Sequence, residues 1–491
     1  MKRFCWTAWA AGAILSVATA GEVPSWKVIC GETTGPEGRA AELITSDVGE
    51  ILLREPGVYA THVLPVWRAA DEPGTNGNVI LIGTLADNPA LARYVKDGDV
   101  PAGGYFVKTF AEGGRSVVLI AGSSPVAALW GAADFVGDGI PALRPNRGNN
   151  LRYERDVFFR GKTIGRYESR RAPASPVRSV FTWGHPIDDY RAYLRNLARL
   201  RLNRVYLWND YPPVNAKEIV DYAHSWGVEV FWGFHWGWST DCKSADRLDL
   251  VRLSDEILAA WRKTWKNLPG DGIYFQTFTE RFGKDDERDR TAARAVELVN
   301  RTAAAMLAEA PAQRIVFGLH AAGVRNHLDD IARTDPRLEI LWEDTGLFPY
   351  SLGMKKLDGL GSAFTQKVLS DAARPVGIVW KSQMIQDWSN WTYQEGPFVL
   401  GSTSRKTYAD DVAIQSALWR EFEKRWIAGF DVAYEEAKRT HAIGPRVEMN
   451  LAAQLNGPIR LPTAIAAELF WDASEPKEKI LDRVLSRRFV E

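Results

Sequence analysis

Carboxylates that directly follow apolar runs are the side chains of this sequence best suited to acid–base chemistry. Glu280 comes after the apolar and aromatic run Ile273–Phe278. Glu343 and Asp344 come after the run Leu338–Trp342. Because an apolar environment raises the pKa of a carboxyl group, Glu280 is the candidate proton donor. Most glycoside hydrolysis requires one protonated and one ionised carboxyl group, so these three residues are the predicted catalytic groups.

Each of these carboxylates also has a structural explanation. Glu280 could pair with Arg281 or cap the helix that is predicted to follow. Glu343 and Asp344 are adjacent, and neighbouring side chains on an extended strand point to opposite sides. Only one of them is therefore expected to face a substrate, while the other orients a loop or holds a water molecule. Glu343 is the first choice, and the reverse assignment stays open.

Polar and aromatic residues follow many of the apolar runs of this sequence. Indole offers a flat apolar face and one N–H donor, which suits stacking on a sugar ring. Histidine, asparagine and aspartate suit contacts with sugar hydroxyl groups. Lys381 adds a fixed positive charge that, together with Arg281, could receive a sugar carboxylate. The predicted substrate-binding residues are Trp183, His185, Asn209, Asp210, His235, Trp236, His320, Trp342, Trp380 and Lys381.

The same residues could serve the structure alone. Any one tryptophan could be core packing, and a single histidine is more often structural than a ligand. Asn209 and Asp210 could cap the loop before Pro212, and Lys381 could pair with Glu343 or Asp344. The collective pattern favours a binding role, because polar residues scattered at random would not gather after so many apolar runs.

Metal-dependent chemistry has no support in the spacing of ligand residues. The chain has seven histidines and no HxH, HExxH or CxxC pattern. Of its three cysteines, Cys5 lies in a segment that processing would remove. Cys30 and Cys242 could then form a single disulfide in an oxidising compartment. We therefore expect no metal and no cofactor.

The elements that must position these residues alternate between short apolar strands and longer amphipathic helices. Strands that alternate with helices in this way predict βαβ units and a parallel sheet. Eight such units fit a (β/α)8 TIM barrel, whose reactive groups lie at the carboxyl ends of the strands. The expected fold class is thus α/β, with a catalytic barrel over residues 175–445. The predicted strands are Arg178–Trp183, Arg204–Trp208, Val228–Phe234, Gly272–Thr277, Arg314–Leu319, Leu338–Trp342, Pro375–Trp380 and Phe430–Tyr434.

Three further segments flank the predicted barrel. Residues 1–20 combine Lys2 and Arg3 with an apolar stretch and Ala18-Thr19-Ala20, which is typical of a secretory signal peptide. Residues 22–155 predict a small α/β accessory domain, and residues 446–491 predict a helical C-terminal segment. Because no later apolar run is long enough for a membrane anchor, we expect a secreted or periplasmic protein with no membrane partner after the signal is removed.

Composition narrows the class of partner. Lys and Arg total 61 and Asp and Glu total 61, so the chain has no overall basic charge with which to hold nucleic acid. The 20 tryptophans are an excess that favours sugar-stacking surfaces, although a large aromatic core would also use them. The expected partner is a carbohydrate and not a nucleic acid.

The order of parts resembles a known group of enzymes. The runs Val79–Gly83, Gly103–Tyr105, Val117–Gly122 and Ala127–Gly131 look like the accessory domain shared by family 20 β-hexosaminidases, α-glucuronidases and related bacterial glycoside hydrolases. This resemblance covers about residues 40–140. The stretch Leu461–Asp472 is similar to the helical tails of those enzymes. The resemblance implies a glycoside hydrolase with this N-terminal domain before a (β/α)8 barrel.

The catalytic residues of these families match only in part. The hexosaminidases carry adjacent Asp-Glu after the fourth strand, whereas this sequence has Thr279-Glu280, which argues against a substrate-assisted mechanism. The α-glucuronidases use an acid after the fourth strand and carboxylates on later strands, and Glu280 with Glu343 or Asp344 is similar to that arrangement. The resemblance therefore leans towards an acidic sugar.

The leading hypothesis is a glycoside hydrolase that removes a terminal, uronic sugar from a polysaccharide or glycan. One alternative within the same class is an N-acetylhexosaminidase or a sialidase-like glycosidase. An alternative from another class is a carbohydrate-binding barrel protein without catalysis, which needs the aromatic and polar residues but not the pair of carboxylates.

Overall fold

The computed structural model describes most of the chain after residue 25. The described residues are 26–53, 64–71, 77–96, 98–145, 152–182, 187–208, 211–237, 245–280, 285–320, 327–343, 374–381, 397–401, 409, 416, 420, 423–444, 447–453 and 455–490. The predicted signal peptide lies outside them. Within them, no helix is long and apolar enough to cross a membrane.

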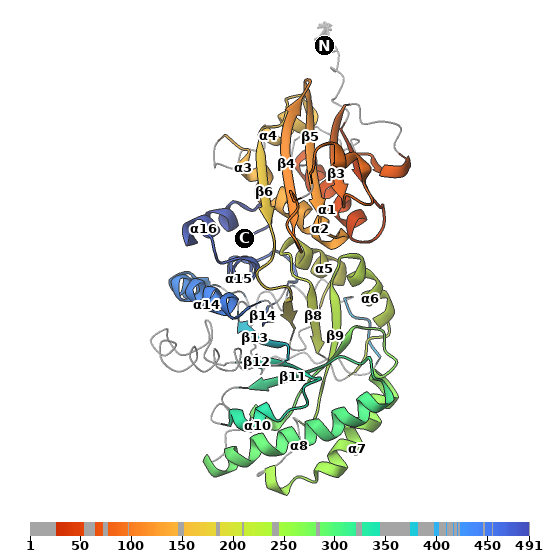
Figure 1. Ribbon diagram of the computed structural model, residues 1–491, viewed down its shortest axis with the longest axis vertical. Helices are drawn as coiled ribbons and strands as arrows, with labels where there is room; N and C mark the ends of the chain where they lie inside the picture. The colour runs from red at the N-terminus through yellow and green to blue at the C-terminus, as the bar shows by residue number, and fades with distance from the viewer. Residues whose placement is uncertain are drawn as a thin grey trace, which may run out of the picture.

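The N-terminal domain is built on a six-stranded mixed sheet with the order β2-β1-β3-β5-β4-β6 (Figure 1). Strands β1 (Trp26–Cys30), β2 (Val66–Arg68), β3 (Asn78–Gly83) and β5 (Arg115–Gly122) pair in parallel. Strand β4 (Tyr105–Glu112) pairs antiparallel with both β5 and β6 (Tyr167–Arg171). Its helices are α1 (Gly35–Leu53), α2 (Pro125–Asp134), α3 (Ile140–Ala142) and α4 (Arg152–Phe159). The sheet therefore extends past the predicted boundary at residue 155, because β6 pairs with β4.

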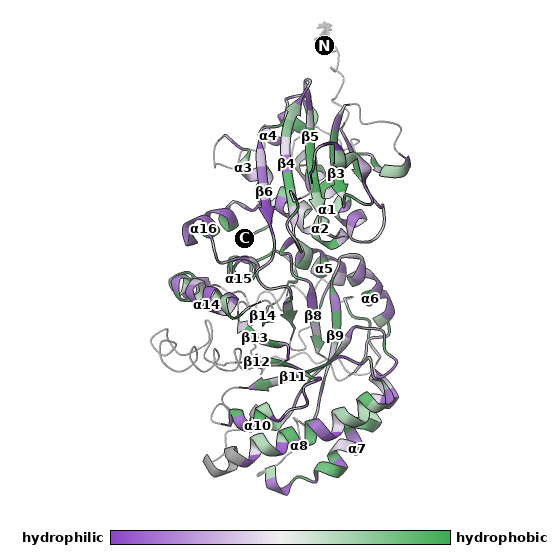
Figure 2. Ribbon diagram, in the orientation of Figure 1, coloured by the Kyte–Doolittle hydropathy of each residue, from purple (hydrophilic) through white to green (hydrophobic). Residues whose placement is uncertain are grey.

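The strands of this sheet differ in polarity according to their position. Figure 2 shows the central strands β3 and β5 as apolar and the edge strand β6 as hydrophilic. Charged side chains on an edge strand discourage pairing with another chain. Cys30 at the end of β1 is a free, buried thiol that donates to the carbonyl oxygen of Trp67 at 3.4 Å. Burial raises the pKa of this thiol to about 11. Cys242, its expected disulfide partner, lies outside the described residues.

The second domain is a closed barrel of eight parallel strands, which confirms the predicted (β/α)8 fold. Its strands are β7 (Arg178–Phe181), β8 (Arg204–Trp208), β9 (Glu229–His235), β10 (Gly272–Gln276), β11 (Ile315–His320), β12 (Glu339–Glu343), β13 (Val376–Lys381) and β14 (Val447–Ala452). The described helices around and after them are α5 (Tyr190–Arg199), α6 (Ala216–Ser225), α7 (Leu250–Ala260), α8 (Asp285–Glu309), α10 (Leu328–Ala332), α14 (Phe430–Ile443), α15 (Leu461–Trp471) and α16 (Lys477–Ser486).

The eighth strand was predicted at the wrong place. Residues Phe430–Tyr434 begin helix α14, and their buried positions recur at helical spacing, with Phe430, Ala433 and Ala437 on one face. The last strand of the barrel is β14, which lies inside the segment 446–491 that was predicted to be helical. Its sequence is VEMNLA, in which Glu448 and Asn450 alternate with apolar residues and interrupt the apolar run.

Large side chains fill the middle of the barrel. One residue of each strand contributes to a single cluster, namely Phe181, Tyr206, Phe231, Tyr274, Val316, Leu341, Val379 and Ala452. Inward-facing glycines on neighbouring strands make room for the aromatic rings. A Cβ atom on Gly318 would lie 2.1 Å from the hydroxyl oxygen of Tyr274, and one on Gly272 would lie 2.3 Å from Cε1 of Phe231.

A network of ion pairs lies near the amino-terminal ends of the strands. Arg204 donates to Glu229 at 2.8 Å, to Glu339 at 3.0 Å and to Glu448 at 2.6 Å. Arg314 donates to Glu229 at 2.8 Å and to Glu339 at 2.9 Å. Because carboxylates of three different strands share these two guanidinium groups, the network ties the floor of the barrel together.

The accessory domain covers this amino-terminal end of the barrel. Arg178, the first residue of β7, lies over the rings of Trp130 and Trp471, with 4.7 Å to each centroid. Arg201, just before β8, donates to the hydroxyl of Tyr105 in β4 at 3.0 Å. In Figure 1, β8 runs away from the accessory sheet. The carboxyl ends of the strands therefore point away from the accessory domain.

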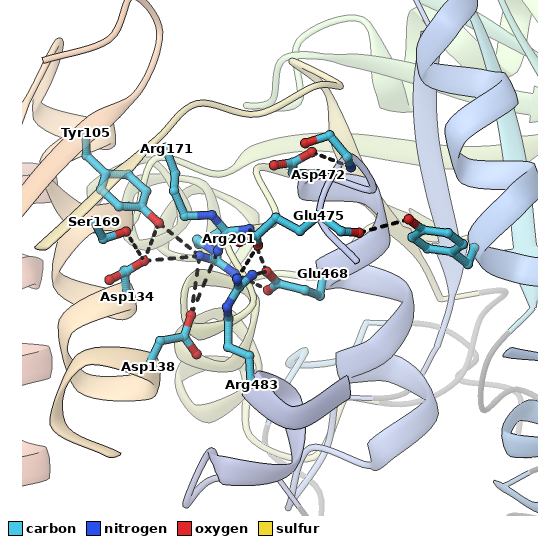
Figure 3. A network of polar contacts seen from close by, with 12 residues as sticks. Tyr105, Asp134, Asp138, Ser169, Arg171, Arg201, Glu468, Asp472, Glu475 and Arg483 are labelled. Carbon is cyan, nitrogen blue, oxygen red and sulfur yellow. Dashed lines mark hydrogen bonds and ion pairs between the residues drawn. The ribbon is translucent and has the colours of Figure 1, made fainter. Parts of the chain in front are cut away.

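Glu468 of α15 is the centre of the contact between the domains (Figure 3). It accepts from Arg171 at 2.7 Å, from Arg483 at 2.7 Å and from Arg487 at 2.6 Å, and it also pairs with Arg201. Burial alone would raise the pKa of Glu468, but these arginines outweigh it and hold the pKa well below its usual range. Arg171 comes from β6 of the accessory sheet, whereas Arg201 precedes β8 of the barrel. Arg483 lies in α16 and Arg487 directly follows it. One carboxylate therefore joins both domains.

We predict that Glu468→Gln destabilises the protein by about 3–5 kcal/mol, because it leaves buried arginines without their shared anion. The measurement is urea unfolding of both domains, together with limited proteolysis. Glu475→Gln is the matched control, since Glu475 also pairs with Arg483 but its side chain is 32% exposed. Equal losses for the two variants would contradict the central place given to Glu468.

A second buried carboxyl group makes the accessory domain sensitive to pH. Glu37 of α1 accepts from the backbone N–H of Glu32 at 2.7 Å, and it lies beside the carboxyl group of Asp87. Burial and the hydrogen bond with Asp87 raise the pKa of Glu37 to about 8. A raised pKa in the folded state means that protonated Glu37 stabilises the fold. This stabilisation is complete below the ordinary pKa of 4.5 and is lost as the pH rises through about 8.

We therefore expect the thermal stability of the Glu37→Gln variant to change less between pH 5 and pH 9 than that of the parent protein. The reason is that the amide cannot ionise. The melting temperature is measured across this range for both proteins. Glu42→Gln, on the same helix but in a surface ion pair with Arg39, should keep the pH dependence of the parent. A Glu37→Gln profile parallel to that of the parent would show that Glu37 does not titrate in this range.

Candidate active site

Polar side chains meet at the carboxyl ends of four neighbouring strands. His235 ends β9, Gln276 ends β10, His320 ends β11 and Glu343 ends β12. The strand register places Gln276 beside His235, and His320 beside Glu343. This is the face of a (β/α)8 barrel at which reactive groups are found.

Glu343 accepts a hydrogen bond from Gln276 and lies next to the imidazole ring of His320. Nε2 of His320 lies 3.2 Å from Oε2 of Glu343. Nε2 of Gln276 lies 3.4 Å from the same oxygen and donates to the hydroxyl of Tyr274 at 2.9 Å. The exposed fractions are 2% for Glu343, 6% for His320 and 8% for Gln276, so the group is almost shielded from water. Hydrogen bonds to a carboxylate are strong in such a setting.

The alternation of the strands explains how these side chains come to face inward. Leu341 belongs to the cluster inside the barrel, so Glu343, two residues later on β12, faces the same way. Val316 fixes the inward face of β11, and Gly318 and His320 follow on that face. Because Gly318 has no side chain, Tyr274 can reach across towards β11 and contact Gln276.

The same alternation corrects the interpretation of three tryptophans. Trp236, Trp342 and Trp380 were predicted to stack on a sugar, but each has an exposed fraction of 0% and lies in the core outside the barrel wall. Trp236 stacks on Phe275 with 3.6 Å between ring centroids, and Trp380 lies 5.2 Å from Phe470. Trp342 precedes the inward-facing Glu343, so it faces the surrounding helices.

The other predicted site residues are described to different extents. His235 is half-buried at the end of β9. The backbone of Glu280 ends a short 3-10 turn after β10, and Lys381 is the last residue of β13, but the side chains of both lie outside the described part of the structure. The predicted residues that lie wholly outside the described residues are Trp183, His185, Asn209, Asp210 and Asp344.

Two members of the site were missed from the sequence. Tyr274 and Gln276 lie two residues apart on β10, and both face the inside of the barrel. Gln276 is the one amide in the strand Gly272–Gln276, and a polar residue in an otherwise apolar strand was the available signal. Among the described residues, no three His, Cys, Asp or Glu side chains lie close enough to hold a metal ion.

Comparisons with known proteins give distant structural similarity. No family model matches the chain, and no curated protein matches it. A GH138 enzyme targeting pectin rhamnogalacturonan II is 12% identical, with a TM-score of 0.42 over 91% of this chain and 47% of that one. The family 89 glycoside hydrolase from Clostridium perfringens in complex with PUGNAc is 10% identical, with a TM-score of 0.43 over 92% of this chain and 51% of that one.

A β-N-acetylhexosaminidase is also 10% identical, with a TM-score of 0.38 over 80% of this chain and 84% of that one. The chain spans about half the length of the first two structures. All three similarities are at low identity, and the assignment of the barrel rests on its own strand order.

We predict that Gly318→Ala destabilises the protein by about 1–3 kcal/mol, because the added methyl group would overlap Tyr274. Chemical unfolding measures the effect. Gly49→Ala is the control, since no atom lies within 4 Å of its added Cβ and alanine favours helix α1. A Gly318→Ala protein as stable as its parent would mean that β11 does not closely approach Tyr274.

Proposed function

We propose that the protein is a glycoside hydrolase in which Glu343 and Glu280 are the two catalytic carboxylates. The observation that carries this proposal is the buried carboxylate of Glu343, which lies at the carboxyl end of a closed barrel and accepts from Gln276 beside His320. Hydrogen bonds donated to a carboxylate favour its ionised form, which a nucleophile or base requires.

Glu280 supplies the proton in this proposal. Its backbone follows β10, and β10 and β12 are separated by β11 alone. Neighbouring strands are about 4.8 Å apart, so these two strands are separated by roughly 10 Å. Carboxyl groups on side chains that start roughly 10 Å apart can reach the distance of about 5–5.5 Å found in retaining glycosidases or that of about 6.5–9.5 Å found in inverting ones.

The proposed substrate is a terminal uronic sugar of a polysaccharide or glycan, and the proposed location is secreted or periplasmic. Support for the acidic sugar comes from Lys381, which ends β13 next to the strand of Glu343. Support for the location comes from the signal-like residues 1–20. The substrate is tested by measuring hydrolysis of aryl uronides, N-acetylhexosaminides, sialosides and neutral glycosides by the purified protein. The location is tested by finding the cell fraction that contains the protein.

The alternative of a substrate-assisted N-acetylhexosaminidase has less support. That mechanism uses a carboxylate directly before the acid, and this chain has Thr279 there, fully buried after β10. The alternative of a carbohydrate-binding protein without catalysis is separated by the same set of aryl glycosides. Binding without turnover of any of them would favour it.

We expect Glu280→Gln to lower kcat by about 10²–10⁴-fold on a glycoside with a poor leaving group, because glutamine cannot donate the proton. The loss should be much smaller on an activated aryl glycoside, whose leaving group needs little protonation. Glu343→Gln should lower the rate on both substrates alike. Steady-state kinetics of the two variants on the paired substrates provide the measurement.

Two results would contradict these roles. Full activity of Glu280→Gln on the poor leaving group would place the acid elsewhere. Equal losses of Glu280→Gln on both substrates would make Glu280 the nucleophile or a binding group.

A further inference from the structure

We propose that His320 and Gln276 are positioning residues that hold Glu343 in the ionised form as the nucleophile, so that Glu343 is not the proton donor. This inference rests on the proposed function, since it assigns one of two roles within the same pair of carboxylates. Tyr274, Gln276 and His320 are called here the Glu343 clamp. None of the three needs to touch the reacting sugar carbon.

The first argument is that two donors converge on one oxygen from two strands. Nε2 of His320 lies 3.2 Å and Nε2 of Gln276 lies 3.4 Å from Oε2 of Glu343. Hydrogen bonds that are donated to a carboxylate favour its ionised form, because they are stronger to the anion than to the neutral acid. The clamp therefore favours the carboxylate over the acid.

The second argument is that the side chain of Gln276 is held in place. Its Nε2 atom also lies 2.9 Å from the hydroxyl of Tyr274. The ring of Tyr274 is itself held by Phe181, Tyr206 and Trp208, with centroid distances of 4.8, 5.2 and 5.8 Å. A ring packed on three sides keeps its hydroxyl in place, and that hydroxyl holds the amide of Gln276 next to Glu343.

The third argument is the charge around Glu343. On the strands of the barrel, the polar or basic residues at the same carboxyl end are His235 on β9, Gln276 on β10, His320 on β11 and Lys381 on β13. On β14, Asn450 pairs in register with Val379 of β13. The described carboxylates of these strands are Glu229, Glu339 and Glu448, which lie at the opposite end.

The distance between these acidic groups and Glu343 can be estimated from the sequence. Glu339 precedes Glu343 by four residues on β12, which is about 13 Å along a strand. Among the side chains that the structure describes, those at the carboxyl ends of the strands beside Glu343 include no second carboxylate. Such surroundings stabilise an anion and disfavour a proton on Glu343.

The resulting reaction balances as a double displacement. An oxygen of Glu343 bonds to the anomeric carbon while the bond to the leaving oxygen breaks, and the leaving oxygen takes a proton from Glu280. Glu280 then removes a proton from water, whose oxygen bonds to the same carbon. The bond to Glu343 breaks with its electron pair returning to the carboxylate, and the configuration of the sugar is retained.

The clamp is tested by direct titration of Glu343, which needs no substrate. Protein labelled with ¹³C at glutamate carboxyl carbons is titrated by NMR, with Glu343→Gln used to assign the signal. His320→Leu, which removes the donor, should raise the pKa of Glu343 by about one unit or more. His320→Gln, whose amide nitrogen can replace Nε2, should restore most of the shift.

A matched histidine provides the control. His224 lies on α6 and pairs with Asp271 at the surface, so His224→Leu should leave the titration of Glu343 unchanged. If His320→Leu also leaves it unchanged, the clamp is wrong, whatever the enzyme hydrolyses. If the titration moves as expected but none of the aryl glycosides is hydrolysed, the clamp stands and the proposed function fails.

The role of nucleophile is tested with sodium azide and the 2,4-dinitrophenyl glycoside of the sugar that is hydrolysed. Azide should rescue Glu343→Ala and give a glycosyl azide of inverted configuration, because it attacks in place of the missing carboxylate. Azide should rescue Glu280→Ala with retained configuration. The opposite pattern would make Glu343 the acid–base residue and overturn the proposal.

Discussion

The alternation of side chains along eight closed strands determines where every polar group of the barrel lies. Inward positions near the strand starts hold the ion pairs around Arg204, and the middle positions hold the aromatic cluster. The last inward positions of β10, β11 and β12 hold Gln276, His320 and Glu343. Because a strand cannot shift by one residue without exchanging its two faces, the position of Glu343 is fixed by the whole barrel.

The buried ion pairs and the proposed site lie at opposite ends of this barrel. The accessory domain and the arginines around Glu468 lie at the amino-terminal end, where they bury charge and join the domains (Figure 3). The Glu343 clamp lies at the carboxyl end, where (β/α)8 barrels carry their reactive groups. This separation explains why the accessory domain can be tied tightly to the barrel without obstructing the proposed reaction.

Sequence reasoning could predict the barrel and the neighbourhood of Glu343, because apolar runs and their polar ends are local features. It failed where the answer depended on which face of a strand is inward. Trp342 and Glu343 are adjacent and cannot both face the inside of the barrel, and the packing of Trp342 in the outer core shows that Glu343 is the one that does. The last strand, β14, was missed because Glu448 and Asn450 serve the inside of the barrel and dilute its apolar pattern.

The central claim is that Glu343 is the carboxylate that bonds to the sugar. The most direct measurement uses a fluorinated glycosyl fluoride of the hydrolysed sugar, which forms a glycosyl-enzyme that breaks down slowly. Mass spectrometry of peptides from the trapped protein then locates the attached sugar. The account predicts that the sugar is on Glu343. A sugar attached to Glu280, or inactivation that leaves the peptide of Glu343 unmodified, would contradict it.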